Sequence, residues 1–209
     1  MFRRKLLAAI GSSLSLPLWA ADREEKVWDV IVVGTGVAGL SAACSALQAG
    51  AQNVLILEKG PIVGGHSILS TGYVAGVDTK RQKKLGITDS PELMLKNMLD
   101  IGGHKNDHEL AKIVCDQSED TIYWLEELGI KWDDNIFQTV AGMYPRSHIT
   151  SPVRAGYDYV MTLLKYALNN GAVLKLNTKA IDLIHDHGTV RGILTEEKGE
   201  HTHRYEAKA

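Results

Sequence analysis

The sequence predicts an α/β fold, and three observations carry this prediction. A glycine-rich turn, G-x-G-x-x-G at residues 34–39, follows the apolar run Val27–Val33. A small, apolar segment with helical character comes directly after the turn. A carboxylate, Glu58, ends the next apolar run, 19 residues after Gly39. This order of strand, glycine turn, helix, strand and acid is typical of a Rossmann-like βαβ unit.

Each residue of the glycine turn has a physical role in that unit. Gly34 permits a tight turn, and Gly36 lets the backbone approach a pyrophosphate because it has no side chain. Gly39 lets the helix pack closely on the strand. Val37 and Ala38 lie at the helix start, where free N–H groups and the positive end of the helix dipole face an anion.

Glu58 supplies the other half of the motif, since a carboxylate there accepts hydrogen bonds from a ribose hydroxyl. The alternative is a glycine-rich turn beside a merely solvated Glu58. The preceding strand, the following helix and the spacing of the acid favour a dinucleotide site. An NAD-type dehydrogenase is a further alternative, which predicts no bound yellow chromophore.

Length and composition set bounds on the class of protein. The chain has 209 residues, 44% hydrophobic and 23% charged, which predicts one globular domain or one domain with part of another. A formal net charge of −2 provides no global field for nucleic acid. The basic run at residues 80–84 indicates a solvated loop rather than a binding patch. We expect Cys44 and Cys115 to be buried thiols, and no cluster has the spacing of a metal site or a c-type haem.

The first 21 residues have the pattern of a secretory signal peptide. Residues 3–5 are Arg-Arg-Lys, residues 6–18 are mostly apolar, and residues 19–21 offer small side chains for cleavage. The apolar run falls short of the ~20 residues that span a bilayer, so no transmembrane segment is expected. The arginine pair leaves the twin-arginine and the general secretory route open. Both routes predict an exported, periplasmic protein whose mature domain begins at Asp22.

The first unit is followed by a long loop. Residues 27–33 form a strand, residues 37–50 a helix ending at Gly50, and residues 53–57 a second strand. Residues 59–79 are rich in glycine and serine with little periodicity, and predict a loop with one helical turn. A loop of this length in a domain is usually functional.

A helical region comes next. Ser90 and Pro91 are typical of a helix start, and that helix runs to Ile101. Asn106 is expected to cap the helix over 107–117, and a third helix runs from residue 118 to a stop at Gly129. Residues 143–156 look irregular. Residues 156–170 then have amphipathic helical spacing and end before Gly171.

Four short strands end the sequence, predicted over residues 172–176, 180–185, 189–195 and 205–208. His187-Gly188 and Lys198-Gly199 supply the turns. The chain stops inside the last of these strands, without a cap, turn or polar tail. We therefore expect residues 22–209 to be one α/β domain that is incomplete at the C-terminus.

These segments together resemble the FAD-binding half of the fumarate reductase/succinate dehydrogenase flavoprotein family, especially its soluble periplasmic, flavocytochrome c-like members. The resemblance covers nearly all of residues 27–209. It is carried by the opening strand, turn and helix and by the acid with its following glycine pair. These two motifs occupy residues 29–43 and 58–67, and four further matches lie at residues 70–72, 120–129, 177–180 and 189–193. It implies a Rossmann-like, GR2-type FAD-binding domain, a βαβ unit with a helical insertion and a β-meander.

The resemblance implies a set of FAD-binding residues. The second glycine pair, soon after the acid, would let the backbone pass close to a large flat ligand. Ser67 and Thr71 would donate hydrogen bonds to phosphate or flavin oxygens, with ordinary loop capping as the alternative. The full set is Gly34, Gly36, Val37, Ala38, Gly39, Glu58, Lys59, Gly64, Gly65, His66, Ser67, Thr71, Gly72 and Ala180.

Two further positions keep alternatives open. His66 stands six residues before Gly72, the spacing at which membrane-bound relatives attach flavin covalently to a histidine. Covalent linkage, a noncovalent flavin contact and a bystander role all fit His66. Arg146 lies in an Arg-x-His segment that is similar to one near the family's domain junction. It would contact an anionic cofactor or substrate, or form a structural salt bridge.

The activity that the resemblance implies is FAD-dependent reduction of an activated C=C bond, fumarate reductase-like, by hydride transfer from flavin. The alternatives are a sibling acting on urocanate or a 3-ketosteroid, or an inactive FAD-binding fragment or split subunit. Electrons would come from a cytochrome or another donor. None of these 209 residues matches the motifs that clamp the small anionic substrate or donate its proton, so no catalytic residue is assigned. We expect this chain alone to be inactive.

Overall fold

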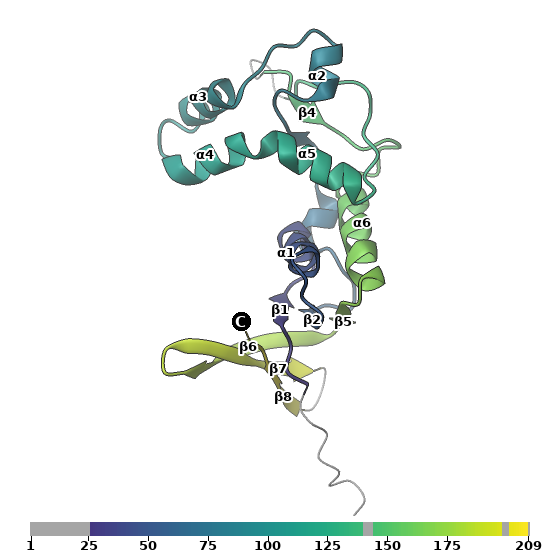
Figure 1. Cartoon of the computed structure of the whole chain (residues 1–209), viewed down its shortest axis with the longest axis vertical. Coiled ribbons are helices and arrows are strands. Elements are labelled where there is room, and N and C mark those ends of the chain that lie inside the picture. Colours follow the sequence, from purple (N-terminus) through teal and green to yellow (C-terminus); the bar gives the residue numbers. More distant parts are fainter. Residues whose placement is uncertain (1–25, 140–143, 198–200, 209) are drawn as a thin grey trace, which may run out of the picture.

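The computed structural model describes residues 26–139, 144–197 and 201–208. The predicted signal peptide and the Lys198-Gly199 turn lie outside these residues. Along the long axis of the chain, a helical insertion at one end, a parallel sheet with two helices and an antiparallel sheet follow one another (Figure 1). No helix of the described part of the chain is long and apolar enough to cross a membrane.

The parallel sheet has three strands in the order β1-β2-β5: β1 (Val30–Val33), β2 (Val54–Leu57) and β5 (Val173–Lys175). Every residue of β2 is buried. Val54 and Ile56 belong to the core shared with helices α1 (Val37–Gln48) and α6 (Gly156–Asn169). Leu55 and Leu57 belong to a second cluster with Trp28 on the opposite face. A strand that is covered on both faces has a continuous apolar sequence, which is why the sequence predicted β2.

The second cluster joins the parallel sheet to the antiparallel sheet, which contributes Ile193 to it. That sheet has the order β6-β7-β8: β6 (Thr178–Asp186), β7 (Thr189–Glu197) and β8 (His201–Glu206). His187 and Gly188 form the first turn, with φ of 47° and 82°. Positive φ at both positions is what a type I′ hairpin requires.

The last strand begins earlier than the sequence predicted. We expected a strand over 205–208, but β8 begins at His201, and Ala207 forms an isolated parallel bridge with Trp28. The reason is that β8 is polar and only Tyr205 packs on an apolar cluster. Backbone pairing with β7, which the sequence pattern does not show, therefore fixes the strand.

The insertion holds four helices, a short 3-10 helix and a small strand pair: η1 (Gly65–Leu69), β3 (Val74–Ala75), α2 (Lys80–Lys84), α3 (Pro91–Ile101), α4 (His108–Asp116), α5 (Ser118–Glu127) and β4 (Ser147–His148). The expected helical turn of the long loop is η1. Within residues 143–156, which looked irregular, β4 pairs with β3 in antiparallel register.

Two predictions about this insertion were wrong. The basic run is helix α2 rather than a solvated loop, because Thr79 and Gln82 form a capping box at its start. The cap of α4 is Asp107 rather than Asn106, since the Asp107 carboxylate accepts a hydrogen bond from the Leu110 N–H at 3.0 Å. Ser90 caps α3 as predicted, by accepting from the Leu93 N–H.

Candidate functional site

The glycine turn connects the end of β1 to the start of α1. The Gly34 N–H donates to the Leu57 carbonyl oxygen at 2.7 Å, which binds the turn to β2. Gly34 has a φ of 96°, a region that side chains disfavour. A Cβ on Gly39 would stand 2.2 Å from the Gly34 carbonyl oxygen. The helix can therefore begin against the turn only because Gly39 has no side chain.

The start of α1 is open to an anion. Its N-cap, Gly36, provides no side-chain hydrogen bond, and the first turn has no acidic residue. The Val37 N–H donates to the Ser67 hydroxyl oxygen at 3.0 Å, and Ala38 is exposed. Because the Ser67 oxygen accepts this bond, its hydrogen stays available for another acceptor. A Cβ on Gly36 would come within 3.3 Å of the Ser67 hydroxyl.

Thr35, which is fully buried, connects the three motif segments. Its N–H and its hydroxyl both donate to Glu58 Oε2, at 3.1 and 2.5 Å. The same hydroxyl oxygen accepts from the Gly64 N–H at 3.0 Å, and the Gly60 N–H donates to Glu58 Oε1 at 2.9 Å. The glycine turn, the acid and the second glycine pair are thus held together by hydrogen bonds of one hydroxyl and one carboxylate.

This frame sets the charge of Glu58, which is 8% exposed. Burial alone would raise the pKa of Glu58, but the hydrogen bonds from the Thr35 hydroxyl, the Gly60 N–H and the Thr35 N–H outweigh it. The pKa lies below its ordinary value, so the carboxylate is charged at neutral pH. Of its roughly four acceptor positions, three are used within the chain, which leaves one for a ligand hydroxyl.

The second glycine pair leads into η1. Gly64 is buried with a φ of 104°, whereas Gly65 is exposed and faces open space. His66 is exposed, and no hydrogen bond holds its ring within the described residues. Lys59, beside the acid, is exposed as well.

Helix α6 contacts the far end, at Gly72, of the segment that follows the second glycine pair. The Tyr159 hydroxyl donates to the Gly72 carbonyl oxygen at 2.6 Å, and a Cβ on Gly72 would stand 2.7 Å from the Ala155 backbone. A Cβ on Gly156 would stand 1.7 Å from the carbonyl oxygen of the η1 residue Ser67. Gly72 is therefore buried against the helix start, while its neighbour Thr71 is exposed.

Ala180 is the predicted site residue that lies apart from the others. It is in β6, and its side chain packs against the cluster formed by Trp28 and the outer face of β2. The start of β6 is nevertheless close to the acid, because the Thr178 N–H donates to the Glu58 carbonyl oxygen at 2.9 Å.

The structure decides between the two roles expected for Arg146, a contact with an anionic ligand and a structural salt bridge. The guanidinium donates to Asp89 at 3.0 Å in a salt bridge whose partners are 9% and 0% exposed, and it also donates to Asn97. The charge of Arg146 is thus neutralised inside the insertion. This is the structural salt bridge, and a contact with an anionic ligand is not supported.

Sequence reasoning missed Thr35, Gly156 and Tyr159. Thr35 stands inside the glycine motif, where a hydroxyl is visible, but its partners are 23 and 29 residues away. The sequence shows Gly156 at a helix start, where a glycine alone indicates only a helix boundary. Nothing in the local sequence indicates the Tyr159 contact, which spans 87 residues.

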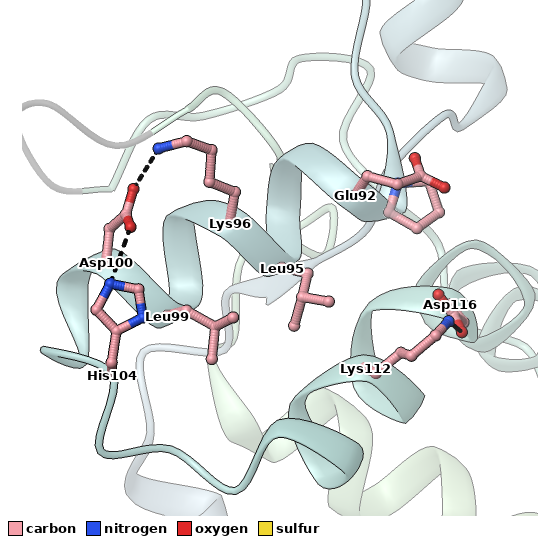
Figure 2. Close-up of a pocket in the computed structure, with 9 residues that line it drawn as sticks. Glu92, Leu95, Lys96, Leu99, Asp100, His104, Lys112 and Asp116 are labelled. Carbon is pink, nitrogen blue, oxygen red and sulfur yellow. Dashed lines mark hydrogen bonds and ion pairs between the residues drawn. The ribbon is translucent and has the colours of Figure 1, made fainter.

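A hollow of about 300 Å³ lies elsewhere, between α3 and α4. Figure 2 shows Lys96 and His104 both reaching Asp100, with Lys112 and Asp116 on the facing helix. Apart from Glu92, its charged side chains form ion pairs with one another, and none of the predicted cofactor residues lines it. No group of His, Cys, Asp and Glu in the described part of the chain could hold a metal ion.

Comparison with known proteins agrees with this geometry. Residues 29–209 match the model of the FAD binding domain family. The chain belongs to this family. It is 36% identical over 182 residues to the fumarate reductase (cytochrome) of Shewanella frigidimarina, covering 87% of this chain and 31% of that protein. It is 35% identical over 189 residues to a urocanate reductase of Eggerthella lenta, a match that covers 87% of this chain and 30% of that protein.

Among solved structures, the open conformation of a flavocytochrome c3 fumarate reductase superposes with a TM-score of 0.82 and 32% identity. That match covers 88% of this chain and 33% of the other. The chain therefore spans about a third of the length of the relatives that it matches. The predicted fold, a Rossmann-like FAD-binding domain with a helical insertion and a β-meander, is confirmed, and FAD is the cofactor.

The residues present fit that cofactor. An uncapped helix start suits a diphosphate, and a charged acid with one free acceptor position suits a ribose. FAD supplies the electron-accepting ring, whereas the chain supplies binding and orientation.

We predict that Thr35→Val lowers the free energy of unfolding by about 2 kcal/mol at neutral pH, because it removes a donor to Glu58 and leaves the buried Gly64 N–H without an acceptor. Stability from Glu58 is present above its unfolded pKa of about 4.5 and is lost as pH falls through the lower folded-state pKa. In Thr35→Val the folded-state pKa of Glu58 is less depressed, so less stability is lost in acid and the loss ends at a higher pH. Denaturant unfolding at several pH values measures both effects. Thr35→Ser is the matched control, and equal stability of the two variants would contradict the prediction.

Proposed function

We propose that this chain is the FAD-binding part of an exported oxidoreductase that reduces an activated C=C bond by hydride transfer from reduced flavin. The observation that carries the proposal is the frame of Thr35, Glu58 and Ser67 at the carboxyl ends of β1 and β2. Ligands of open α/β sheets bind at this edge. The similarity to reductases of fumarate and urocanate supports the reaction class.

The diphosphate would lie at the start of α1. The N–H groups of Ala38 and Gly39 in the first helical turn have no acceptor within the helix, and the Ser67 hydroxyl hydrogen can reach the same anion. Gly34 and Gly36 keep this surface free of side chains. The Val37 N–H remains with Ser67 and so fixes the hydroxyl that contacts the phosphate.

The two ends of the cofactor would lie on either side of the diphosphate. Glu58 accepts a ribose hydroxyl, with Lys59 beside it and the backbone at Ala180 toward the adenine. The flavin end follows the chain along η1, past Gly65 to Gly72. Exposed Thr71 offers a hydroxyl to the ring.

For His66 we propose a noncovalent flavin contact. Its side chain is exposed on η1, directly before Ser67 of the proposed diphosphate site. No neighbour within the described residues holds its ring in one orientation. A covalent bond requires one imidazole nitrogen to be held at the flavin as an unprotonated nucleophile, and nothing here fixes that state.

The substrate and the electron donor belong to the proposal as well. We propose a small anionic substrate, fumarate-like, bound by parts of the protein beyond these residues, because no catalytic residue is assigned within them. A cytochrome is the proposed electron donor, because the similar proteins include a fumarate reductase (cytochrome) and a flavocytochrome c3 fumarate reductase. Urocanate is the second candidate substrate, favoured by the urocanate reductase match. Residues 1–21 support export to the periplasm and lie outside the described residues.

The proposed activity is tested on the whole natural gene product loaded with FAD. We expect reduced methyl viologen to be reoxidised on addition of fumarate, with loss of the C=C bond in the product. Urocanate replaces fumarate in a parallel assay and identifies the alternative. A protein that is yellow but inactive with both would contradict the reductase proposal and favour an FAD-binding part without activity of its own. A colourless protein that ignores FAD would contradict the cofactor site.

We predict that Ser67→Ala weakens FAD binding about tenfold to a hundredfold, because it removes one hydrogen bond to a charged group. Quenching of flavin fluorescence during titration measures the dissociation constant. Ser45→Ala, an exposed position on the outer side of the same helix, is the control and should bind as the unchanged protein does. Equal affinities of the two variants would remove Ser67 from the site.

We predict that acid precipitation releases all flavin from the holoprotein. A denaturing gel should then show no fluorescent protein band, for both the unchanged protein and His66→Ala. The variant should retain FAD with reduced affinity, because only a noncovalent contact is lost. A fluorescent band that disappears in His66→Ala would instead establish the covalent bond.

A further inference from the structure

A closed ring of buried polar side chains connects β4 to the start of α2. Its members are between 0% and 7% exposed and come from four parts of the insertion: Thr79, Gln82, Asp89, Arg146 and His148. None of them belongs to the predicted cofactor residues. Apart from Arg146 Nε, which is buried without a partner, the buried side-chain polar atoms of the ring are hydrogen-bonded, as such burial requires.

The hydrogen bonds of His148 assign its protonation state. Nδ1 lies 3.1 Å from the Arg146 carbonyl oxygen, and Nε2 lies 3.1 Å from the Thr79 hydroxyl oxygen. Because a carbonyl only accepts, Nδ1 carries the hydrogen. The neutral ring then accepts from the Thr79 hydroxyl at Nε2. The Thr79 oxygen in turn accepts from the Gln82 N–H at 3.2 Å.

The remaining bonds of the ring connect Gln82, Asp89 and Arg146. The Gln82 side-chain nitrogen donates to Asp89 at 3.0 Å, and Asp89 accepts from the Arg146 guanidinium at 3.0 Å. A second proton on His148 would point at the Thr79 oxygen and turn the hydroxyl hydrogen away from its acceptor. That hydrogen would become a buried donor without a partner, beside a buried charge.

The ring holds the strand that follows the proposed flavin loop. Strand β3 begins two residues after Gly72, and its only strand partner within the described residues is β4, over two residue pairs. The Gly76 N–H adds a bond to the Arg146 carbonyl oxygen at 3.0 Å. That oxygen also accepts from His148, so one atom joins β3, β4 and the ring.

We infer that Thr79 and His148 are positioning residues for the flavin: the neutral imidazole ties β4 to the start of α2, and β4 holds β3 and the Gly72 loop in register. This inference rests on the proposed function, which places the flavin ring at that loop. Neither side chain needs to touch the cofactor for it.

The surroundings of His148 favour the neutral ring. Burial lowers the pKa of His148, and the bond to the Arg146 carbonyl only partly opposes this. The charged groups around the ring are paired: Arg81 of α2, which lowers the pKa, binds Glu126 of α5, which raises it, at 3.0 Å. Asp89 and Arg146 form the second pair. The net shift is downward, so the ring of the folded protein is still neutral at the ordinary histidine pKa of about 6.5, and the tie is lost only as pH falls through the lower folded-state pKa.

The test is an FAD titration of the whole natural gene product at several pH values between about 5 and about 7.5. We expect the unchanged protein to bind FAD about three- to tenfold more weakly at the acid end, since protonation breaks the ring. His148→Asn keeps a donor to the Arg146 carbonyl but cannot be protonated, so its affinity should not change with pH. Thr79→Val should bind at neutral pH as weakly as the unchanged protein does in acid, and Thr79→Ser should restore the original profile.

Two controls separate positioning from stability alone. Ser90→Ala removes a helix cap outside the ring and should keep the pH profile of the unchanged protein. His66 is exposed near the proposed flavin site, and a profile that persists in His148→Asn would assign the pH effect to His66 or another group and overturn the inference. A flat profile in the unchanged protein would overturn it as well.

Failure of the proposed function has a different signature, because the protein would then bind no FAD at any pH. In that case the ring is still tested by nitrogen NMR of labelled histidine at neutral pH. A His148 whose Nε2 carries a hydrogen would overturn the inference, whereas an unprotonated Nε2 supports the tie between β4 and α2.

Discussion

The pair of Thr35 and Glu58 is the constraint on which the rest of the site depends. One hydroxyl donates to the acid and accepts from the second glycine pair, so three segments that are distant in sequence share two buried groups. If the hydroxyl were absent, the Gly64 N–H would be buried without a partner and the acid would lose a donor. The frame is assembled from the chain's own atoms, which means that a ligand finds its acceptor and donors already oriented. Such preorganisation reduces the ordering cost of binding.

Close backbone contacts complete this frame at two helix starts. Helix α1 begins against Gly34 because Gly39 has no side chain, and α6 begins against the carbonyl of Ser67 because Gly156 has none. Ser67 therefore lies between the two helices, with its hydroxyl at α1 and its carbonyl at α6. A side chain at Gly156 would displace η1 from the start of α6, whereas one at Gly39 would displace α1 from the glycine turn. The close contact with Gly156 and the bond from Val37 to Ser67 therefore hold η1 in place, although most of its residues are exposed.

The parts of this fold that the sequence predicted are those whose signal is local. The glycine turn, the apolar run of β2 and the distance to Glu58 are readable because their meaning depends on neighbouring residues. The partners of Thr35 and the contact of Tyr159 with Gly72 join segments 23 to 87 residues apart, and no local pattern records them. Strand β8 was misplaced for the same reason, since its polar residues are held by pairing rather than by an apolar period.

The errors in the insertion have a different physical origin, a competition between equally suitable local signals. Asn106 and Asp107 are both good helix caps, and only the side-chain geometry shows that Asp107 accepts the bond. The run after Thr79 is charged enough to favour a solvated loop, yet the capping box supplies two hydrogen bonds that begin a helix. That box also places the Thr79 hydroxyl where His148 can use it. The misread segment is thus the one that closes the buried ring.

The two ends of the proposed cofactor tract respond differently to acid. At the ribose end, the pKa of Glu58 lies below its ordinary value, so this carboxylate keeps its charge through mildly acid conditions. At Gly72, where the proposed flavin tract ends, burial raises the pKa of Tyr159, whose hydroxyl therefore remains a donor. At the flavin end, the tie contains an imidazole that takes up a proton once the pH falls below its ordinary range. Acid therefore acts on different groups at the two ends: it protonates an imidazole in the tie at the flavin end and a carboxylate in the ribose frame.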